Sequence, residues 1–183
     1  MMYPSSAEPV LPMTPLRVSL LLLLFLFAGP EAARAADPFE SFIVGLRSTC
    51  ARAPAMSCTT AVSRFLDSDR NGKVEPHELD AASRMATAAI GKSDGPLNAT
   101  ERSSVAVALM ILKSAGTPQV IAGFDSNGDG GISNTEMFQD FRIDRRPFGA
   151  IVRDRKSVDW SALSQRFGKV GGLLKGLEPP PSK

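Results

Sequence analysis

Apolar residues recur at three- and four-residue spacing along most of the chain, a pattern typical of amphipathic helices that share a core. The first predicted helix covers residues 37–49. Asp37 would cap it, and Pro38 would take the first helical position, where a missing N–H costs nothing. No segment alternates convincingly with a period of two, so the sequence predicts an all-α protein.

The same spacing predicts further helices, each with a start or stop signal in the sequence. Asn98 with Glu101 three residues later is typical of a helix N-cap, and Asp94-Gly95-Pro96 breaks the preceding helix. The glycines that follow Phe167 weaken any helix beyond it. The second helix should start near Thr59 or Thr60 and end at Leu66, and the third should cover 79–90. The helix that starts at Asn98 should end at Gly116, and the next should start at Thr117-Pro118. Helical structure should continue over 137–141 after the second loop, and Ser157 should cap the last helix.

The N-terminal region has the layout of a secretory signal peptide. Arg17 precedes the apolar run 18–28, and Ala33-Arg34-Ala35 fits a small-residue cleavage site. A membrane-spanning helix needs about 20 apolar residues, so the alternative of an uncleaved anchor is less favoured. We therefore predict a signal peptide over 1–35, cleavage near Ala35, and a periplasmic or secreted mature protein.

The chain has two cysteines, Cys50 and Cys58. In an oxidising compartment two cysteines this close together most simply form a disulfide. Their spacing is not C-x-x-C, so a structural link is favoured over redox catalysis. We predict that residues 36–58 form an N-terminal helix and a disulfide-closed loop.

Two loops carry oxygen-bearing side chains at matching positions, Asp67–Glu78 and Asp125–Glu136. Calcium takes six to eight oxygen ligands, and such a loop can supply most of them from positions 1, 3, 5, 7, 9 and 12, with a glycine at position 6 for a sharp turn. Position 7 binds through its backbone carbonyl. The predicted metal ligands are Asp67, Asp69, Asn71, Lys73, Glu75 and Glu78, and Asp125, Asn127, Asp129, Gly131, Ser133 and Glu136.

These loops and their flanking helical patterns resemble the EF-hand family over residues 59–141. The resemblance implies helix–loop–helix units, two bound Ca²⁺ ions, and a short β-bridge between loops through the apolar residue at position 8, which is Val74 or Ile132. Together with the signal peptide, it most resembles the small exported EF-hand proteins of the bacterial periplasm.

The two loops start 58 residues apart, which is too far for a simple adjacent pair. Residues 90–101 echo the motif at Gly95, Leu97 and Glu101, but Ile90 and Lys92 are unsuitable as ligands. This segment is either a degenerate EF-hand that pairs with the second loop or an ordinary helix–turn–helix. The sequence leaves both interpretations open, and with them the pairing of the loops.

The C-terminal part is expected to be a basic helical segment over 142–177 followed by a disordered tail over 178–183. The basic residues of its first half can meet an anionic surface, although a solvated face is favoured because acidic residues are interspersed. They are Arg142, Arg145, Arg146, Arg153, Arg155 and Lys156.

The residue composition and the two loops narrow the functions that we expect for this chain. The chain has one histidine, His77, and no hydrolase constellation, so we predict no enzyme and no nucleic-acid partner. The expected role is an exported calcium sensor or adaptor with a calcium-dependent protein partner. The alternative is a calcium buffer or a calcium-stabilised structural protein.

Overall fold

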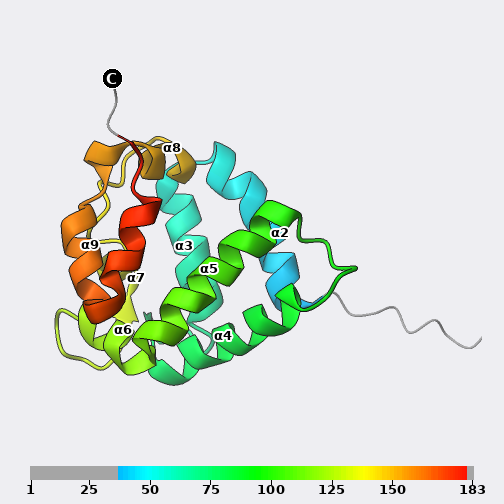
Figure 1. The fold of residues 1–183 in the computed structure, drawn as a ribbon, viewed down its shortest axis with the longest axis horizontal. Coiled ribbons are helices and arrows are strands. Elements are labelled where there is room, and N and C mark those ends of the chain that lie inside the picture. Colours follow the sequence, from blue (N-terminus) through cyan, green and yellow to red (C-terminus); the bar gives the residue numbers. More distant parts are fainter. Residues whose placement is uncertain (1–36, 181–183) are drawn as a thin grey trace, which may run out of the picture. The chain divides into compact units, whose positions relative to one another are not determined.

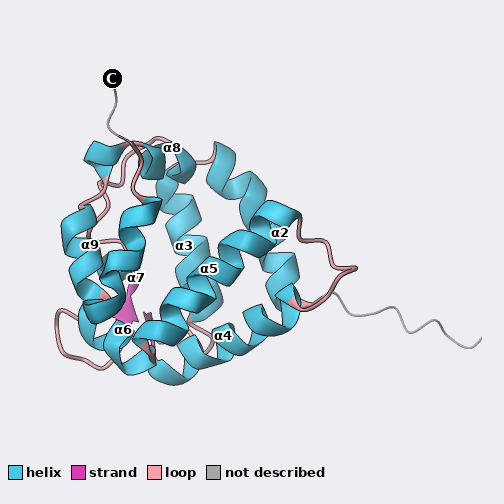
Figure 2. Cartoon of the chain, viewed as in Figure 1, coloured by secondary structure: helices cyan, strands magenta, loops and turns pink. Residues whose placement is uncertain are grey.

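The structure, a computed structural model, describes residues 37–180, and helices dominate this range (Figure 1). Two short strands pair with each other in a two-stranded sheet (Figure 2). The prediction of an all-α fold with a short bridge between the loops is confirmed. The elements are α2 (Pro38–Arg52), α3 (Ala55–Leu66), β1 (Lys73–Val74), α4 (Pro76–Ile90), α5 (Ala99–Ala115), α6 (Thr117–Phe124), β2 (Ile132–Ser133), α7 (Asn134–Met137), α8 (Phe148–Arg153), α9 (Trp160–Arg166), and the 3₁₀ helices η1 (Arg155–Ser157) and η2 (Gly168–Leu177).

Helix α2 begins where the sequence predicts. Asp37 Oδ1 accepts hydrogen bonds from the backbone N–H of Phe39 at 2.9 Å and of Glu40 at 3.3 Å, which satisfies two donors that the helix leaves unpaired. Pro38 occupies the first helical position. The helix ends at Arg52, slightly later than predicted.

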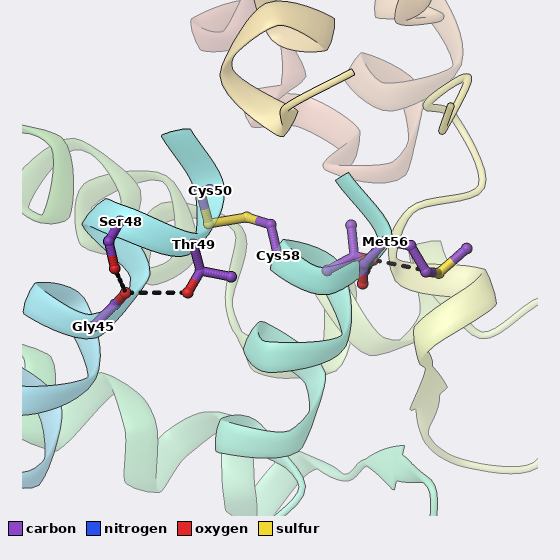
Figure 3. Close-up of a disulfide and its surroundings, with 7 residues drawn as sticks. Gly45, Ser48, Thr49, Cys50, Met56 and Cys58 are labelled. Atoms are coloured by element: carbon purple, nitrogen blue, oxygen red, sulfur yellow. Dashed lines mark hydrogen bonds between the residues drawn. A yellow bond between two sulfur atoms is a disulfide. The ribbon is translucent and has the colours of Figure 1, made fainter. Parts of the chain in front are cut away.

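A disulfide joins the C-terminal part of α2 to the first turn of α3, as predicted (Figure 3). The Cα atoms of Cys50 and Cys58 are 4.8 Å apart, and no free cysteine is present in the described residues. Farther along the same helix pair, the rings of Phe42 and Phe65 stack with centroids 3.8 Å apart. Because disulfides persist in oxidising compartments, this bond points to an extracytoplasmic location.

The apolar core has two clusters, and α5 contributes to both. Leu109 packs with Phe39 and Ala89 of α2 and α4 in one cluster. Ile111 packs in the other with α6, β2 and the C-terminal helices. Helix α5 therefore connects the N-terminal helices to the second loop and the C-terminal segment.

The expected cap of the last helix is wrong. Helix α9 begins at Trp160, and its cap is Asp159, whose Oδ1 accepts from Ala162 N at 2.9 Å. The hydroxyl of Ser157 is buried and is already committed, since it donates to Asp154 and accepts from Arg146. Ser157 therefore belongs to the preceding 3₁₀ helix η1 and does not cap α9.

The predicted signal peptide and the last three residues of the predicted tail lie outside the described residues. Among the described helices, none alone has the length and apolar composition of a membrane span. Helices α5 and α6 reach that composition only as a pair, and a bend of 91° separates them.

Candidate metal centre

The first loop follows the end of α3 and gathers three carboxylates. Asp67, Asp69 and Glu78 each place one oxygen within 4.8 Å of the others, close enough to share one ion. Glu78 is 2 % exposed and belongs to the first turn of α4. The cluster therefore joins the loop to the helix that leaves it, and it can hold a metal ion.

The buried carboxylate of Glu78 closes the loop on itself. Its Oε1 accepts hydrogen bonds from Ser68 N at 2.6 Å, Ser68 Oγ at 2.8 Å and Asp69 N at 3.2 Å. Its Oε2 accepts from Glu75 N at 3.0 Å. Burial raises the pKa of Glu78, but these hydrogen bonds favour the charged form more strongly, so the pKa lies below its ordinary value.

The second loop repeats this network at an offset of 58 residues. Glu136 Oε1 accepts from Ser126 N and Oγ at 2.9 and 3.0 Å and from Asn127 N at 3.2 Å. Its Oε2 accepts from Ser133 N and Oγ at 2.9 and 2.8 Å. Burial raises the pKa of Glu136, but the bonds from Ser133 and Ser126 outweigh it and lower the pKa from 4.5 to about 2.

The loop turns also match in detail. Asp67 accepts from Asn71 N and Gly72 N at 3.0 and 2.9 Å. Asp125 accepts from the corresponding residues, Asp129 N and Gly130 N, at 3.1 and 2.9 Å. The glycines at position 6 have positive φ in both loops, 93° and 85°, as the sharp turn requires.

The remaining predicted ligands differ between the loops. Asn71 and Asn127 at positions 5 and 3 use Oδ1 to accept from backbone N–H groups, so they line the turns. Glu75 is not in the acidic cluster; its carboxylate lies 3.9 Å from Lys73 Nζ and 3.7 Å from His77 Nδ1. Lys73 and Gly131 stand at position 7, where the predicted ligand is the backbone carbonyl; the side chain of Lys73 lies between Glu75 of its own loop and Asp129 of the other. In the described residues no second group of three carboxylates meets the spacing of the first.

The two loops pair with each other. Strands β1 and β2 are antiparallel, with Lys73 opposite Ser133 and Val74 opposite Ile132. Val74 and Ile132, both at position 8, are 1 % and 4 % exposed. The tertiary fold thus brings together two loops that start 58 residues apart, because the intervening helices α4, α5 and α6 double back.

The hypothesis that residues 90–101 pair with the second loop is therefore wrong. This segment is the turn between α4 and α5, and it contains no strand. The guanidinium of Arg102 donates to the carbonyls of Lys92 and Gly95, and its Nε donates to Leu97 O at 3.0 Å. An internal cation thus holds the turn where the motif of the other loops would require metal ligands.

Lys73 connects the two loops electrostatically. Its Nζ donates to the backbone carbonyl of Asp129 at 2.8 Å and lies 3.6 Å from the Asp129 carboxylate. A lysine of the first loop thus places its charge beside a predicted ligand of the second. A cation bound in the second loop would be repelled by this charge.

Sequence reasoning missed the serine at position 2 of each loop. Ser68 and Ser126 both donate from the hydroxyl and the backbone to the glutamate at position 12. The repeated Asp-Ser pair at the start of both loops is the signal that could have revealed this role.

The basic residues of the predicted segment are exposed, and Arg146 and Arg155 pair with acidic side chains. Arg146 lies 2.9 Å from both Asp144 and Asp154, and Arg155 lies 2.6 Å from Glu178. The side chains of Asp144 and Asp154 lower the free positive charge of this face. The solvated-face interpretation accounts for these contacts.

Comparisons with protein-family models, with curated proteins and with solved structures found no match. The described residues define a mainly helical protein with a short two-stranded bridge and one acidic cluster that can hold a metal ion.

Proposed function

We propose that this protein is an exported EF-hand protein that binds two calcium ions, one in each loop. The observation that carries the proposal is the convergence of Asp67, Asp69 and Glu78 oxygens within 4.8 Å in a loop between two helices. Carboxylate, amide and carbonyl oxygens are the ligands that calcium prefers, and a flexible loop suits it better than the strict octahedral geometry of magnesium.

The near-repetition of the hydrogen-bond network supports a second site. The loops share the same contacts at positions 1, 2, 6 and 12, and they face each other across the β1–β2 bridge. In the second loop the ligands would be Asp125, Asn127, Asp129 and Glu136 with the carbonyl of Gly131. We expect weaker binding there, because this loop has fewer gathered carboxylates and Lys73 lies beside Asp129.

The proposal also covers the location of the protein and its role. The disulfide and the leader pattern support a periplasmic or secreted protein cleaved near Ala35. We propose a calcium sensor or adaptor with a protein partner, which an apolar cavity of about 610 Å³ beside α5 supports. A calcium-stabilised structural protein is the second candidate. It is supported by the internal hydrogen bonds that Glu78 and Glu136 accept, because these bonds hold each loop in shape without an ion.

Titration calorimetry on the purified protein tests the calcium proposal. We expect two calcium ions per chain, with Glu78→Gln losing the first site and Glu136→Gln the second. Asp144→Asn, which removes an exposed carboxylate that lies outside both loops and pairs with Arg146, is the matched control and should still bind two ions. Absence of both calcium binding heat and a calcium-dependent shift in melting temperature for the wild type would contradict the proposal.

A hydrophobic dye separates the two roles. A sensor should bind more dye when calcium is added, because its interhelical angles change and expose apolar surface. A structural protein should melt at a higher temperature with calcium, without added dye binding.

A further inference from the structure

The C-terminal segment η2 covers an apolar groove. A cavity of about 610 Å³ lies between this segment and the helices beneath it. Ile111, Leu112 and Val120 line the helix side, and Leu174 and Leu177 line the segment side. Leu174 is 5 % exposed and belongs to the same core cluster as β2 of the second loop. The segment therefore occupies the groove but fills it incompletely.

The segment itself is weakly built. It is a 3₁₀ helix of ten residues, whereas such helices rarely exceed three or four residues because their hydrogen-bond geometry is poor. Among its residues whose burial is described, only Gly171 and Leu174 are buried. Leu173 and Leu177 remain 47 % and 51 % exposed. Because Gly171 and Leu174 fix the segment to the core while its other described residues are accessible, its local opening should cost less than global unfolding.

Two features seat the segment. Gly171 lies against the backbone of α9, and a Cβ at this position would overlap the carbonyl oxygen of Ser164. At the end of the segment, Glu178 pairs with Arg155 at 2.6 Å. Figure 1 shows the segment (red) running alongside α9 (orange). The neighbouring Gly172 has no atom within 4 Å of a Cβ, so close approach is needed only at Gly171.

We propose that residues 168–177 act as a displaceable strap, which in the arrangement seen closes the apolar groove along α5 and whose release exposes that groove. The rim is already apolar on both sides. Val107 of α5 is 37 % exposed and lines the same cavity as Leu177 of the segment, which is 51 % exposed. Opening joins these exposed residues to the groove floor and produces a contiguous apolar surface of the kind that marks interaction sites.

The proposal goes beyond calcium binding and does not depend on it. The test is therefore made on the full protein in EDTA, with the dye 8-anilinonaphthalene-1-sulfonate as the probe. We expect Gly171→Ala, which cannot approach Ser164, to raise dye fluorescence several-fold. The control Gly172→Ala should behave as wild type. A synthetic peptide of residues 167–178 should reverse the increase by refilling the groove.

Urea unfolding followed by circular dichroism decides whether the strap is separable from the core. Gly171→Ala should keep a cooperative transition, because a strap leaves the remaining fold intact when it opens. Equal fluorescence for Gly171→Ala and Gly172→Ala would overturn the proposal. Loss of the cooperative transition in Gly171→Ala would also overturn it, since the segment would then be part of the core.

Discussion

Glutamine at position 136 offers a quantitative test of how the second loop is held in the absence of metal. The carboxylate of Glu136 is 6 % exposed and accepts hydrogen bonds on both oxygens, from Ser126 and Asn127 on one and from Ser133 on the other. Glutamine has nearly the same shape but only one accepting oxygen. Whichever way its amide turns, its NH₂ group faces a backbone N–H that has lost its acceptor.

Two estimates of the cost agree. An unsatisfied buried donor costs about 1–3 kcal/mol, and hydrogen bonds to a charged acceptor are about 1.5–3 kcal/mol each. The gap between the ordinary pKa of 4.5 and the folded pKa of about 2 corresponds to about 3 kcal/mol of unfolding free energy at neutral pH. We therefore expect Glu136→Gln to lower the unfolding free energy of the calcium-free protein by about 2–3 kcal/mol.

The pKa of Glu136 also determines how the stability difference between wild type and variant changes with pH. The folded pKa of Glu136 is below its unfolded value, so its contribution is complete above 4.5 and is lost as the pH falls toward about 2. Glutamine does not titrate. The stability difference between wild type and variant should therefore be largest at neutral pH and should shrink as the medium is acidified through this window.

Urea titrations in EDTA from neutral to acidic pH measure this difference directly. Glu178→Gln is the control, because that carboxylate makes an ion pair with exposed Arg155, and such pairs contribute about 0–1 kcal/mol. A cost below about 0.5 kcal/mol at neutral pH, or a cost that does not change on acidification, would refute the reasoning.

Three further predictions concern the loops and the disulfide. Arg70 has φ 64° at the position where the second loop has Gly128, and the left-handed region costs a residue other than glycine about 1–2 kcal/mol. In urea titration Arg70→Gly should therefore not lower the unfolding free energy, whereas Gly128→Arg should lower it by about 1 kcal/mol. If the calcium proposal holds, Lys73→Met should tighten binding in the second loop in calorimetry, more so at low salt, because it removes a charge 3.6 Å from Asp129; unchanged affinity would contradict this. Cys58→Ser should lower the unfolding free energy by about 2–3 kcal/mol, and a reducing agent should have the same effect on the wild type but none on the variant.

The helix starts at Asp37, Asn98 and Thr117 could be predicted because their causes are local. The helix expected over 137–141 was wrong, since α7 ends at Met137, and α3 begins at Ala55, earlier than the expected Thr59 or Thr60. Asp37 caps α2 through bonds to residues two and three positions away, and Asn98 forms its capping box with Glu101. The chain has two cysteines, so Cys50 and Cys58 could form a disulfide within the chain only with each other. Where two local signals competed, as at Ser157 and Asp159, the pattern did not show which serine or aspartate the preceding turn would use.

The sequence by itself determined the chemistry of the two loops, since oxygen-bearing residues and turn glycines stand at fixed offsets within each. Only the tertiary structure decided which loops meet. Val74 and Ile132 lie far apart in the sequence, and their pairing depends on how α4, α5 and α6 fold back, which burial of a shared core determines. The position of the C-terminal segment has the same origin, because the contact of Gly171 with Ser164 exists only once α9 and η2 pack.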